Sequence, residues 1–283
     1  MRGRQYKMKT RLRLPNVIKN IFLTLFAFII TYPILFVLLG SFKSNKEIMM
    51  DPFGLPSTLS IVNYSKAWNE GVLYALFKNS IIVTFTSVIL IVIFSSLIAF
   101  VMTRENFKFK YFLYPVIVIG ITIPYQIGIL PLFMQLNSFH LIDTYLGLII
   151  VYTVYNLPFS TFIMYGFFKH ISKEIQEAAA IDGCGNFRMY FNIIMPLSPS
   201  VITTICIFNL MFVWNDMFFA LVLIQSKLLK TLTVGLFAFQ GQYMNDYATM
   251  FAGVIIVSLP MIILFLILQK RFIEGIASGA VKG

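Results

Sequence analysis

Long stretches without any charged residue alternate with short polar segments along this chain. The first stretch lies between Lys19 and Lys43, and five more of similar length follow it. A transmembrane helix needs about 20 apolar residues to cross a hydrocarbon core of about 30 Å, whereas helices on a water-soluble core carry a narrower apolar stripe that charges interrupt. The pattern therefore predicts an all-α, polytopic membrane protein with six transmembrane helices. The expected spans are residues 18–41, 77–103, 111–134, 144–168, 198–224 and 248–269.

Prolines and turn residues modify this pattern at two places. Pro124 and Pro131 lie within the third apolar run, and proline removes a helix hydrogen bond and kinks or ends a helix. We therefore expect a bent third span, which is tolerated where neighbouring helices or a water-filled cavity satisfy the freed carbonyls. Between the first two spans, the turn-rich stretch 51–56 precedes residues 59–71, for which we expect a short surface helix.

The distribution of basic residues predicts the orientation in the membrane. Composition supports the membrane assignment, since 59% of the 283 residues are hydrophobic and only 12% are charged. If the N-terminus is cytoplasmic, sixteen of the 22 Lys and Arg residues lie in cytoplasmic segments, and the positive-inside rule then places both termini in the cytoplasm. The net charge of +11 therefore needs no nucleic acid to explain it.

Three parts of the chain follow from this orientation: a basic cytoplasmic arm (1–17), a transmembrane domain (18–270) and a cytoplasmic tail (271–283). The arm has no acidic residue and would favour an anionic inner leaflet. The apolar run after it is too long for the central region of a signal peptide and lacks a small-x-small cleavage site, so we expect a retained first span.

Residues that carry chemistry are scarce. Cys184 and Cys206 are expected on the cytoplasmic side and within the membrane respectively, so they do not pair, and His140 and His170 lie far apart in sequence. The chain has no G-x-x-x-x-G-K-[ST], G-x-S-x-G or H-E-x-x-H motif. We therefore expect no metal or other cofactor on this chain and no enzymatic activity, and another subunit must bind any ATP that is used.

The longest cytoplasmic loop, about 169–197, has the signals of a helix with defined ends. Ser172 is a suitable N-cap, and Glu174 and Glu177 favour the positive N-terminal end of a helix. Alanines at 178–180 are strong helix formers. The helix should stop at Asp182-Gly183, because glycine adopts the left-handed cap conformation at little cost.

Small residues on this helix favour docking to another protein. Three- and four-residue spacing places Ile171, Ile175, Ala178 and Ala179 on one face, and small side chains let a backbone sit deep in a groove. The alternative is an interfacial helix that rests on lipid, but such helices carry large apolar anchors. A second, amphipathic helix should follow and lie against the ends of the spans, and prolines should begin the next span. Its expected cap is Asn186, its apolar positions are Phe187, Tyr190, Phe191 and Ile194, and the prolines are Pro196 and Pro199.

The same loop resembles the EAA loop of ABC importer permeases. The matching pattern is Glu177-Ala178-Ala179, then Gly183, then nine residues and Ile193-x-x-Pro196, although the family usually has Leu where this chain has Met195. Further segments resemble the carbohydrate-uptake branch of this family, among them "FVWNDMFFALVLI" and "QKRFIEGIASGAVKG". The terminal Gly-Ala-Val-Lys-Gly resembles the end of the smaller, six-span permease of maltose-type importers.

This resemblance implies a set of partners and a mechanism. The chain would form a heterodimer with a second, homologous permease in the plasma membrane of a prokaryote. Two ATPase subunits would bind ATP and Mg, and an extracytoplasmic binding protein would deliver a sugar or oligosaccharide. Residues 172–181 would form the coupling helix, seated in a cleft of one ATPase. Within it Glu177 would make a polar contact, Ala178 and Ala179 would pack in the cleft, and Asp182-Gly183 would make the turn.

The resemblance also implies contacts for the C-terminal tail and for one external stretch. The tail at 279–283 could reach the ATPase, although its small residues equally suit a disordered terminus. The external stretch 236–250 would contact the binding protein.

Polar residues within the spans are candidates for a substrate path, because they are costly in lipid unless they have a function. Trp214 could stack on a sugar ring and Asp216 could bind its hydroxyls. The alternative is hydrogen bonding between helices, which is common for Asn and Gln in membranes. The full candidate set is Gln126, Asn156, Asn209, Trp214, Asn215 and Asp216.

Two other classes of function compete with an ATP-driven permease. An ion-coupled secondary transporter would need an intramembrane ionisable relay or paired broken helices, and only Asp216 lies well within an expected span. A membrane-embedded enzyme would need a clustered nucleophile or metal set. Dependence of uptake on ATP in vesicles separates the permease from the secondary transporter.

Overall fold

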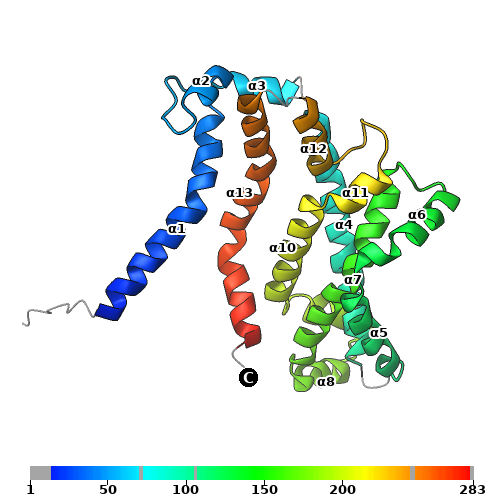
Figure 1. Ribbon diagram of the computed structural model, residues 1–283. Helices are drawn as coiled ribbons and strands as arrows, with labels where there is room; N and C mark the ends of the chain where they lie inside the picture. The colour runs from blue at the N-terminus through cyan, green and yellow to red at the C-terminus, as the bar shows by residue number, and fades with distance from the viewer. Residues whose placement is uncertain (1–13, 70–72, 105–106, 243–245, 281–283) are drawn as a thin grey trace, which may run out of the picture.

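The computed structural model describes residues 14–69, 73–104, 107–242 and 246–280, with side chains in 19–69, 73–104, 107–237 and 246–269. All regular secondary structure in this part of the chain is helical (Figure 1). The basic arm at 1–17 and the last residues of the tail fall largely outside these ranges. The tail expected from residue 271 continues as helix as far as Ala280.

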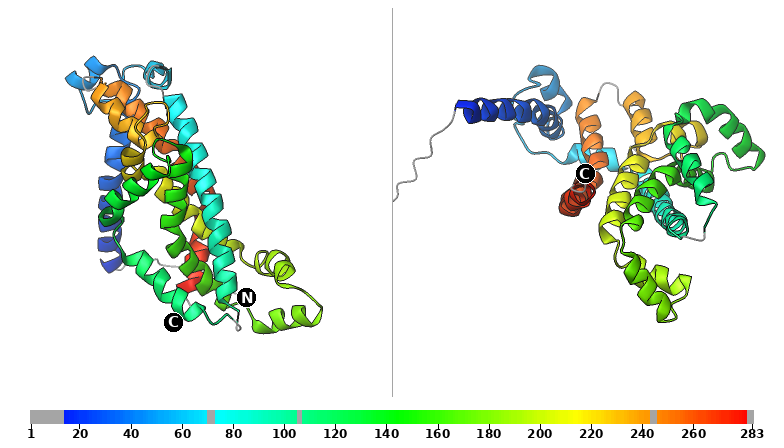
Figure 2. Two further views of the ribbon diagram at one scale, coloured as in Figure 1. Left: turned by 90° about the vertical axis from the view of Figure 1, so that its right-hand side faces the viewer. Right: turned by 90° about the horizontal axis from the view of Figure 1, so that it is seen from below.

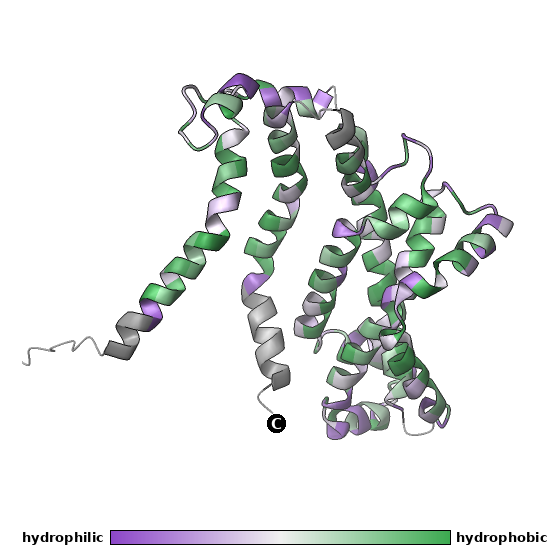
Figure 3. Cartoon of the chain, viewed as in Figure 1, coloured by the Kyte–Doolittle hydropathy of each residue, from purple (hydrophilic) through white to green (hydrophobic). Residues whose placement is uncertain are grey.

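Four helices are long and apolar enough to cross a membrane, and two bent pairs bring the number to six if each pair is one span. The all-α polytopic fold is thereby confirmed for the described residues. In Figure 3 the hydrophobic colour follows these helices. The four single helices are α1 (Leu14–Gly40), α4 (Leu73–Met102), α7 (Tyr145–Lys169) and α13 (Tyr247–Ala280).

The two ends of the bundle are defined by short helices. Both α2 (Asn45–Met50) and α3 (Val62–Asn69) lie at one end, here called the α3 end, and the expected surface helix in 59–71 is thus confirmed. At the opposite end, here called the α8 end, lie α8 (Lys173–Ile181), the described start of α1 and the end of α13 (Figure 1).

The third apolar run forms a broken helix. The elements α5 (Lys110–Thr122) and α6 (Ile129–Ser138) are joined by the 3₁₀ turn η1 (Tyr125–Gly128), with a bend of 92°. Pro124 directly precedes η1, which confirms the expected bend there. Pro131 causes no further break, because this proline lies in the first turn of α6, where no N–H is needed.

The fifth apolar run is not the single span that the sequence predicts. Helix α10 (Pro199–Asn215) has 17 residues, and after a break a separate short helix, α11 (Phe218–Leu223), follows. The backbone leaves the helical region at Asp216, with ψ of 130°. Helix α12 (Leu232–Gln242) then leads toward α13.

The core lies where α4, α7 and α10 pack together. Side chains of Leu148 and Tyr152 on α7 and Phe219 on α11 are buried in its largest cluster. Helix α4 also buries hydroxyl residues such as Ser95 and Ser96, and small residues of this kind let membrane helices approach closely.

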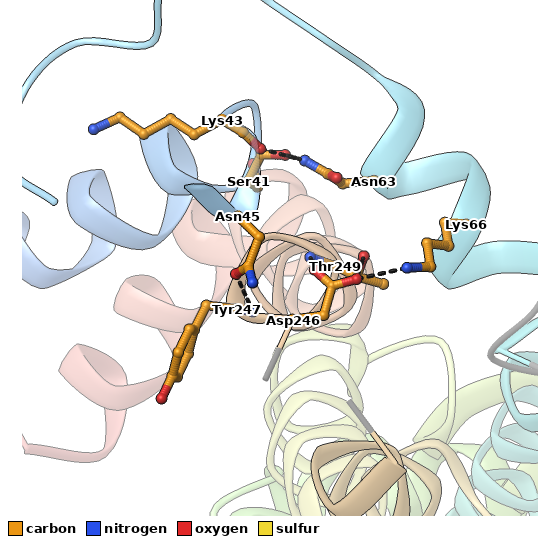
Figure 4. Close-up of polar contacts among 8 residues, drawn as sticks. All are labelled: Ser41, Lys43, Asn45, Asn63, Lys66, Asp246, Tyr247 and Thr249. Carbon is orange, nitrogen blue, oxygen red and sulfur yellow. Dashed lines mark hydrogen bonds and ion pairs between the residues drawn. The ribbon is translucent and has the colours of Figure 1, made fainter. Parts of the chain in front are cut away.

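Polar contacts at the α3 end join α1, α3 and α13 (Figure 4). The Asn63 amide donates to the backbone oxygens of Ser41 and Lys43, each at 2.8 Å. Lys66 forms an ion pair of 2.6 Å with Asp246, which directly precedes α13. We call these residues the α3 clasp.

Away from the α3 clasp, α1 diverges from the rest of the bundle (Figures 1 and 2). In the described chain, none of the apolar window of α1 is buried. This surface must therefore be covered by lipid or by another protein chain.

Candidate functional site

The loop between α7 and α10 is a folded unit that projects from the bundle at the α8 end (Figure 2). Helix α8 begins after Ser172, whose hydroxyl oxygen accepts a hydrogen bond from the Glu174 N–H at 3.2 Å. The expected helix at 172–181 and its cap are thus confirmed. Figure 3 shows that α8 is more hydrophilic than the spans.

Helix α8 ends in a Schellman motif at Gly183. This glycine has φ of +75°, in the left-handed region that favours glycine. Its N–H donates to the Ala180 oxygen at 3.1 Å, and the Cys184 N–H donates to the Ala179 oxygen at 2.9 Å. The predicted stop at Asp182-Gly183 is confirmed, and the loop leaves α8 in a defined direction.

The two central alanines of α8 point in different directions. Ala179 is buried against side chains of its own chain, in a cluster with Met189 and Ile194. Ala178 is exposed. The two alanines therefore do not share an outward face, since consecutive helical residues are about 100° apart, and docking of Ala178 to an ATPase stays a prediction. The face turned away from the bundle consists of Glu174, Glu177, Ala178 and Ile181, and the Ile181 side chain is 86% exposed.

After α8, a short helix passes into a π-helical turn. Helix α9 (Asn186–Met189) is followed by η2 (Tyr190–Ile194), in which the Met195 N–H donates to the Tyr190 oxygen. The N-cap of α9 is Gly185, so the expected cap at Asn186 was wrong by one residue.

The π turn changes which residues face the bundle. Tyr190 and Ile194 are buried as expected, but Phe187 and Phe191 are exposed. The expected four-residue apolar face was therefore half wrong, because a π turn adds one residue and rotates the side chains before and after it. Pro199 lies in the first turn of α10 as expected, whereas Pro196 lies in the preceding turn.

Ser96 on α4 and Arg104 just beyond its end hold this loop against the bundle. The hydroxyls of Ser96 and Tyr190 are hydrogen-bonded at 2.7 Å within the protein interior. Arg104, just beyond α4, donates from Nη1 to Gln176 Oε1 at 3.3 Å. Its guanidinium carbon lies 4.1 Å from the centre of the Phe100 ring.

Arg104 is partly desolvated, and this burial lowers the pKa of its guanidinium. Arginine nevertheless remains protonated in proteins, so its charge acts on the contacts to α8.

Sequence reasoning missed Arg104, Gln176 and Ser96. The one available signal was that Arg104 is the first charged residue after a long apolar run.

The candidate residues of the substrate path differ in exposure and in hydrogen-bond partners. Gln126 in η1 and Asn215 at the end of α10 are exposed. Asn156 is buried, and its amide donates to the Tyr152 backbone oxygen at 2.8 Å. The Asn209 amide donates to Ser160 Oγ at 3.0 Å, which is the helix-to-helix bond considered as the alternative.

Trp214 and Asp216 have structural partners in this conformation. The buried Trp214 indole donates to the Val257 backbone oxygen at 3.3 Å. The Asp216 carboxylate accepts from the Tyr152 hydroxyl at 2.8 Å and from the Phe219 N–H at 3.0 Å. Asp216 therefore accepts a hydrogen bond from a backbone N–H in the first turn of α11. The sequence reasoning did not assign this role to it.

Metal binding has no support in the described part of the chain. Among those residues, no group of three His, Cys, Asp or Glu lies close enough to hold an ion.

Comparisons of the sequence with known proteins identify its family. Residues 91–277 match the family model described as "Binding-protein-dependent transport system inner membrane component". The chain is 36% identical to the probable ABC transporter permease YurM of Bacillus subtilis, over 93% of this chain and 87% of the relative. It is 33% identical to the diacetylchitobiose uptake system permease NgcG of Streptomyces coelicolor, over 94% of this chain and 88% of the relative.

Among solved structures, the fold is similar to a chain of a bacterial ABC transporter involved in the import of the acidic polysaccharide alginate. The TM-score is 0.81 with 22% sequence identity, and the match covers 95% of this chain and 100% of that chain. A chain of a bacterial alginate ABC transporter in complex with a pentasaccharide-bound periplasmic protein matches with a TM-score of 0.65 and 13% identity, over 90% and 92% of the two chains.

Proposed function

The chain belongs to the family of binding-protein-dependent transport system inner membrane components, and on that premise we propose that its α8 couples sugar transport to a separate ATPase. It is a permease subunit of a carbohydrate ABC importer and a multi-pass plasma-membrane protein of a prokaryote. Helix α8 is the coupling helix, and the α8 end faces the cytoplasm. ATP and Mg are bound by two ATPase subunits, not by this chain.

The observation that carries this proposal is the exposed face of α8. This helix is capped at both ends, projects from the bundle and presents Glu177, Ala178 and Ile181 away from it. The 86% exposed Ile181 side chain, beside acidic and small residues, is free to enter a protein cleft. In this arrangement Glu177 makes the polar contact, Ala178 permits close approach, and Ile181 is the apolar anchor. Ala179 holds α8 to its own chain.

A second permease completes the membrane part. The apolar window of α1 has no buried residue in the described chain, and we propose that a homologous permease covers part of it to form a heterodimer. An extracytoplasmic binding protein delivers the sugar at the α3 end. The exposed candidates Gln126 and Asn215 remain proposed contacts of the sugar, whereas Trp214, Asn209 and Asp216 support the helices in this conformation.

Co-purification of the tagged, full-length chain from its host membrane tests the coupling role. Glu177→Arg and Ile181→Asp change the outward face of α8, and we expect both to lose the ATPase while retaining the second permease. Lys108→Glu is the control, because Lys108 is exposed on the neighbouring α4–α5 loop. Uptake in vesicles should require ATP. Uptake that follows an ion gradient without ATP would favour the secondary transporter instead.

A further inference from the structure

The segment that links α2 to α3, residues 49–62, is held in place by hydrogen bonds to polar groups. Lys43 is only 1% exposed, and its ammonium donates to the Asp51 backbone oxygen at 2.8 Å. The Asp51 carboxylate accepts from the Gly54 N–H at 3.0 Å, and Glu47 accepts from the Ser57 N–H at 2.7 Å. Figure 4 shows the Lys43 side chain pointing away from Asn63. These bonds give the loop a defined shape.

The apolar side chains of this loop point outward. Seven of them are between 66% and 78% exposed. They are Met49, Met50, Phe53, Leu55, Leu59, Ile61 and Val62. Loops in water usually have the opposite arrangement, with polar side chains on the surface. Exposed polar side chains such as Asp51, Ser57 and Thr58 lie between these apolar ones, and an exposed apolar group of this size indicates contact with a membrane or with another protein.

The position of the loop indicates which of these two it contacts. The ring centres of Phe53 and Phe36 are 5.8 Å apart, so the loop folds back along α1 (Figure 1). Phe36 lies four residues before Gly40, the last residue of α1, which corresponds to a depth of about 6 Å inside the end of the span. The apolar surface of the loop is thus continuous with the apolar surface of α1.

We propose that residues 49–62 form a membrane anchor that inserts its apolar side chains into the leaflet around the Gly40 end of α1. Lipid supplies no hydrogen-bond partners, and the bonds of Lys43 to the Asp51 oxygen and of the Asp51 carboxylate to the Gly54 N–H satisfy part of this backbone internally. Interfacial segments bury their apolar side chains about 5–10 Å into the boundary between headgroups and acyl chains, which matches the depth of Phe36.

Lipid-dependent quenching of a fluorescent probe tests this anchor. Cys184→Ser and Cys206→Ser remove the native thiols, and Leu55→Cys or Asn69→Cys then carries an environment-sensitive dye. Asn69 is the control because it is exposed on α3 at the same end of the bundle. The full importer complex is reconstituted in nanodiscs whose lipids carry a nitroxide either near the headgroup or at the middle of the acyl chain.

For the probe at 55 we expect a blue-shifted emission and several-fold stronger quenching by the shallow nitroxide than for the probe at 69. Iodide in the buffer should quench the probe at 69 more strongly. Equal access of iodide to both probes would overturn the anchor. Protection of the probe at 55 from iodide without quenching by either nitroxide would also overturn it, since a protein would then cover the loop.

A third variant tests whether Lys43 holds the loop in place. Lys43→Met removes the donor to the Asp51 oxygen, and in the Leu55→Cys background we expect quenching by the shallow nitroxide to fall. The probe at 69 should not change. Unaltered quenching at 55 would show that Lys43 does not position the anchor.

Discussion

Arg104 and Gln176 connect the end of α4 to α8, with 3.3 Å between Arg104 Nη1 and Gln176 Oε1. The same guanidinium lies over the Phe100 ring and donates to Met189 Sδ at 2.8 Å. One side chain therefore contacts a membrane span, α8 and α9. A displacement of α8 must move the end of α4 or break these contacts.

The first prediction concerns this connection. Arg104→Ala should weaken the attachment of α8 to α4 by roughly 1–2 kcal/mol, since it removes a charged hydrogen bond and a cation–π contact. We expect faster tryptic cleavage at Lys169 or Lys173 and lower ATP-driven uptake. Lys108→Ala removes an exposed positive charge nearby and should leave both unchanged. Equal effects of the two variants would show that only the local charge matters.

The second prediction uses two glycines of the loop between α7 and α10. Gly183 has φ of +75° and Gly185 has φ of −69°, while a Cβ at either would meet no atom within 4 Å. Gly183→Ala should therefore cost about 1–2 kcal/mol, whereas Gly185→Ala causes no backbone strain and weakens only the N-cap of α9. Hydrogen exchange of the α8 amides measures this, with an increase of about 5- to 30-fold expected for Gly183→Ala alone.

The third prediction tests the buried bond between Ser96 and Tyr190. Tyr190→Phe should destabilise the protein by about 0.5–1.5 kcal/mol, the usual value for one hydrogen bond. In the double variant Ser96→Ala and Tyr190→Phe, the losses should be less than additive, because each single change already removes the same bond. Thermal unfolding in nanodiscs measures these differences. Tyr114→Phe is the control, since that side chain is 39% exposed and should be near neutral.

The fourth prediction separates structural and substrate roles at the end of α10. Asp216→Ala leaves the buried Tyr152 hydroxyl and the Phe219 N–H without their acceptor. The free energy of unfolding should therefore fall by about 1–3 kcal/mol, and the melting temperature should fall with it. Asn215→Ala, at an exposed neighbour, should leave the melting temperature unchanged. A normal melting temperature with a raised KM for sugar in Asp216→Ala would support substrate contact instead.

The fifth prediction concerns pH at the α3 clasp. Burial of the Asp246 carboxyl raises its pKa, but the hydrogen bonds from Lys66 and Thr249 outweigh this and hold the pKa below its ordinary value. The stabilisation is therefore present above the unfolded pKa of about 3.9 and is lost as the pH falls through the lower, folded pKa.

Comparison with Asp246→Asn measures this effect. At pH 7 the wild type should be more stable by about 0.2–1 kcal/mol, the range for an exposed ion pair, because the Lys66 side chain is 37% exposed. The difference in melting temperature should disappear in strong acid. A difference that stays constant from pH 7 to strong acid would contradict the ion-pair explanation.

The positions of the spans were predictable because lipid demands long apolar segments, and the ends of α8 were predictable because caps depend on local residues such as Ser172 and Gly183. The break at Asp216 was not predictable, since it depends on a hydroxyl of α7 and on amides that become free only when the helix ends. The direction of Phe187 and Phe191 depends on the π turn, for which the local sequence has no distinct signal.

The same limit applies to the contacts of the candidate site. Ala178 and Ala179 are equivalent in composition, and only the packing of Met189 and Ile194 decides which of them faces the bundle. Asn209 and Trp214 likewise have polar partners on other helices, which no spacing within one helix reveals.

The length of α13 has a mechanical consequence. Its 34 residues make a rod about 51 Å long, whereas the hydrocarbon core is about 30 Å thick. The α3 clasp pins one end of this rod, and the other end extends past the bilayer at the α8 end. Pro260 lies inside α13, and a proline there removes one helix hydrogen bond, so the rod can bend at this point. The last helix is therefore long enough to link the α3 clasp on one side of the membrane to the α8 end on the other.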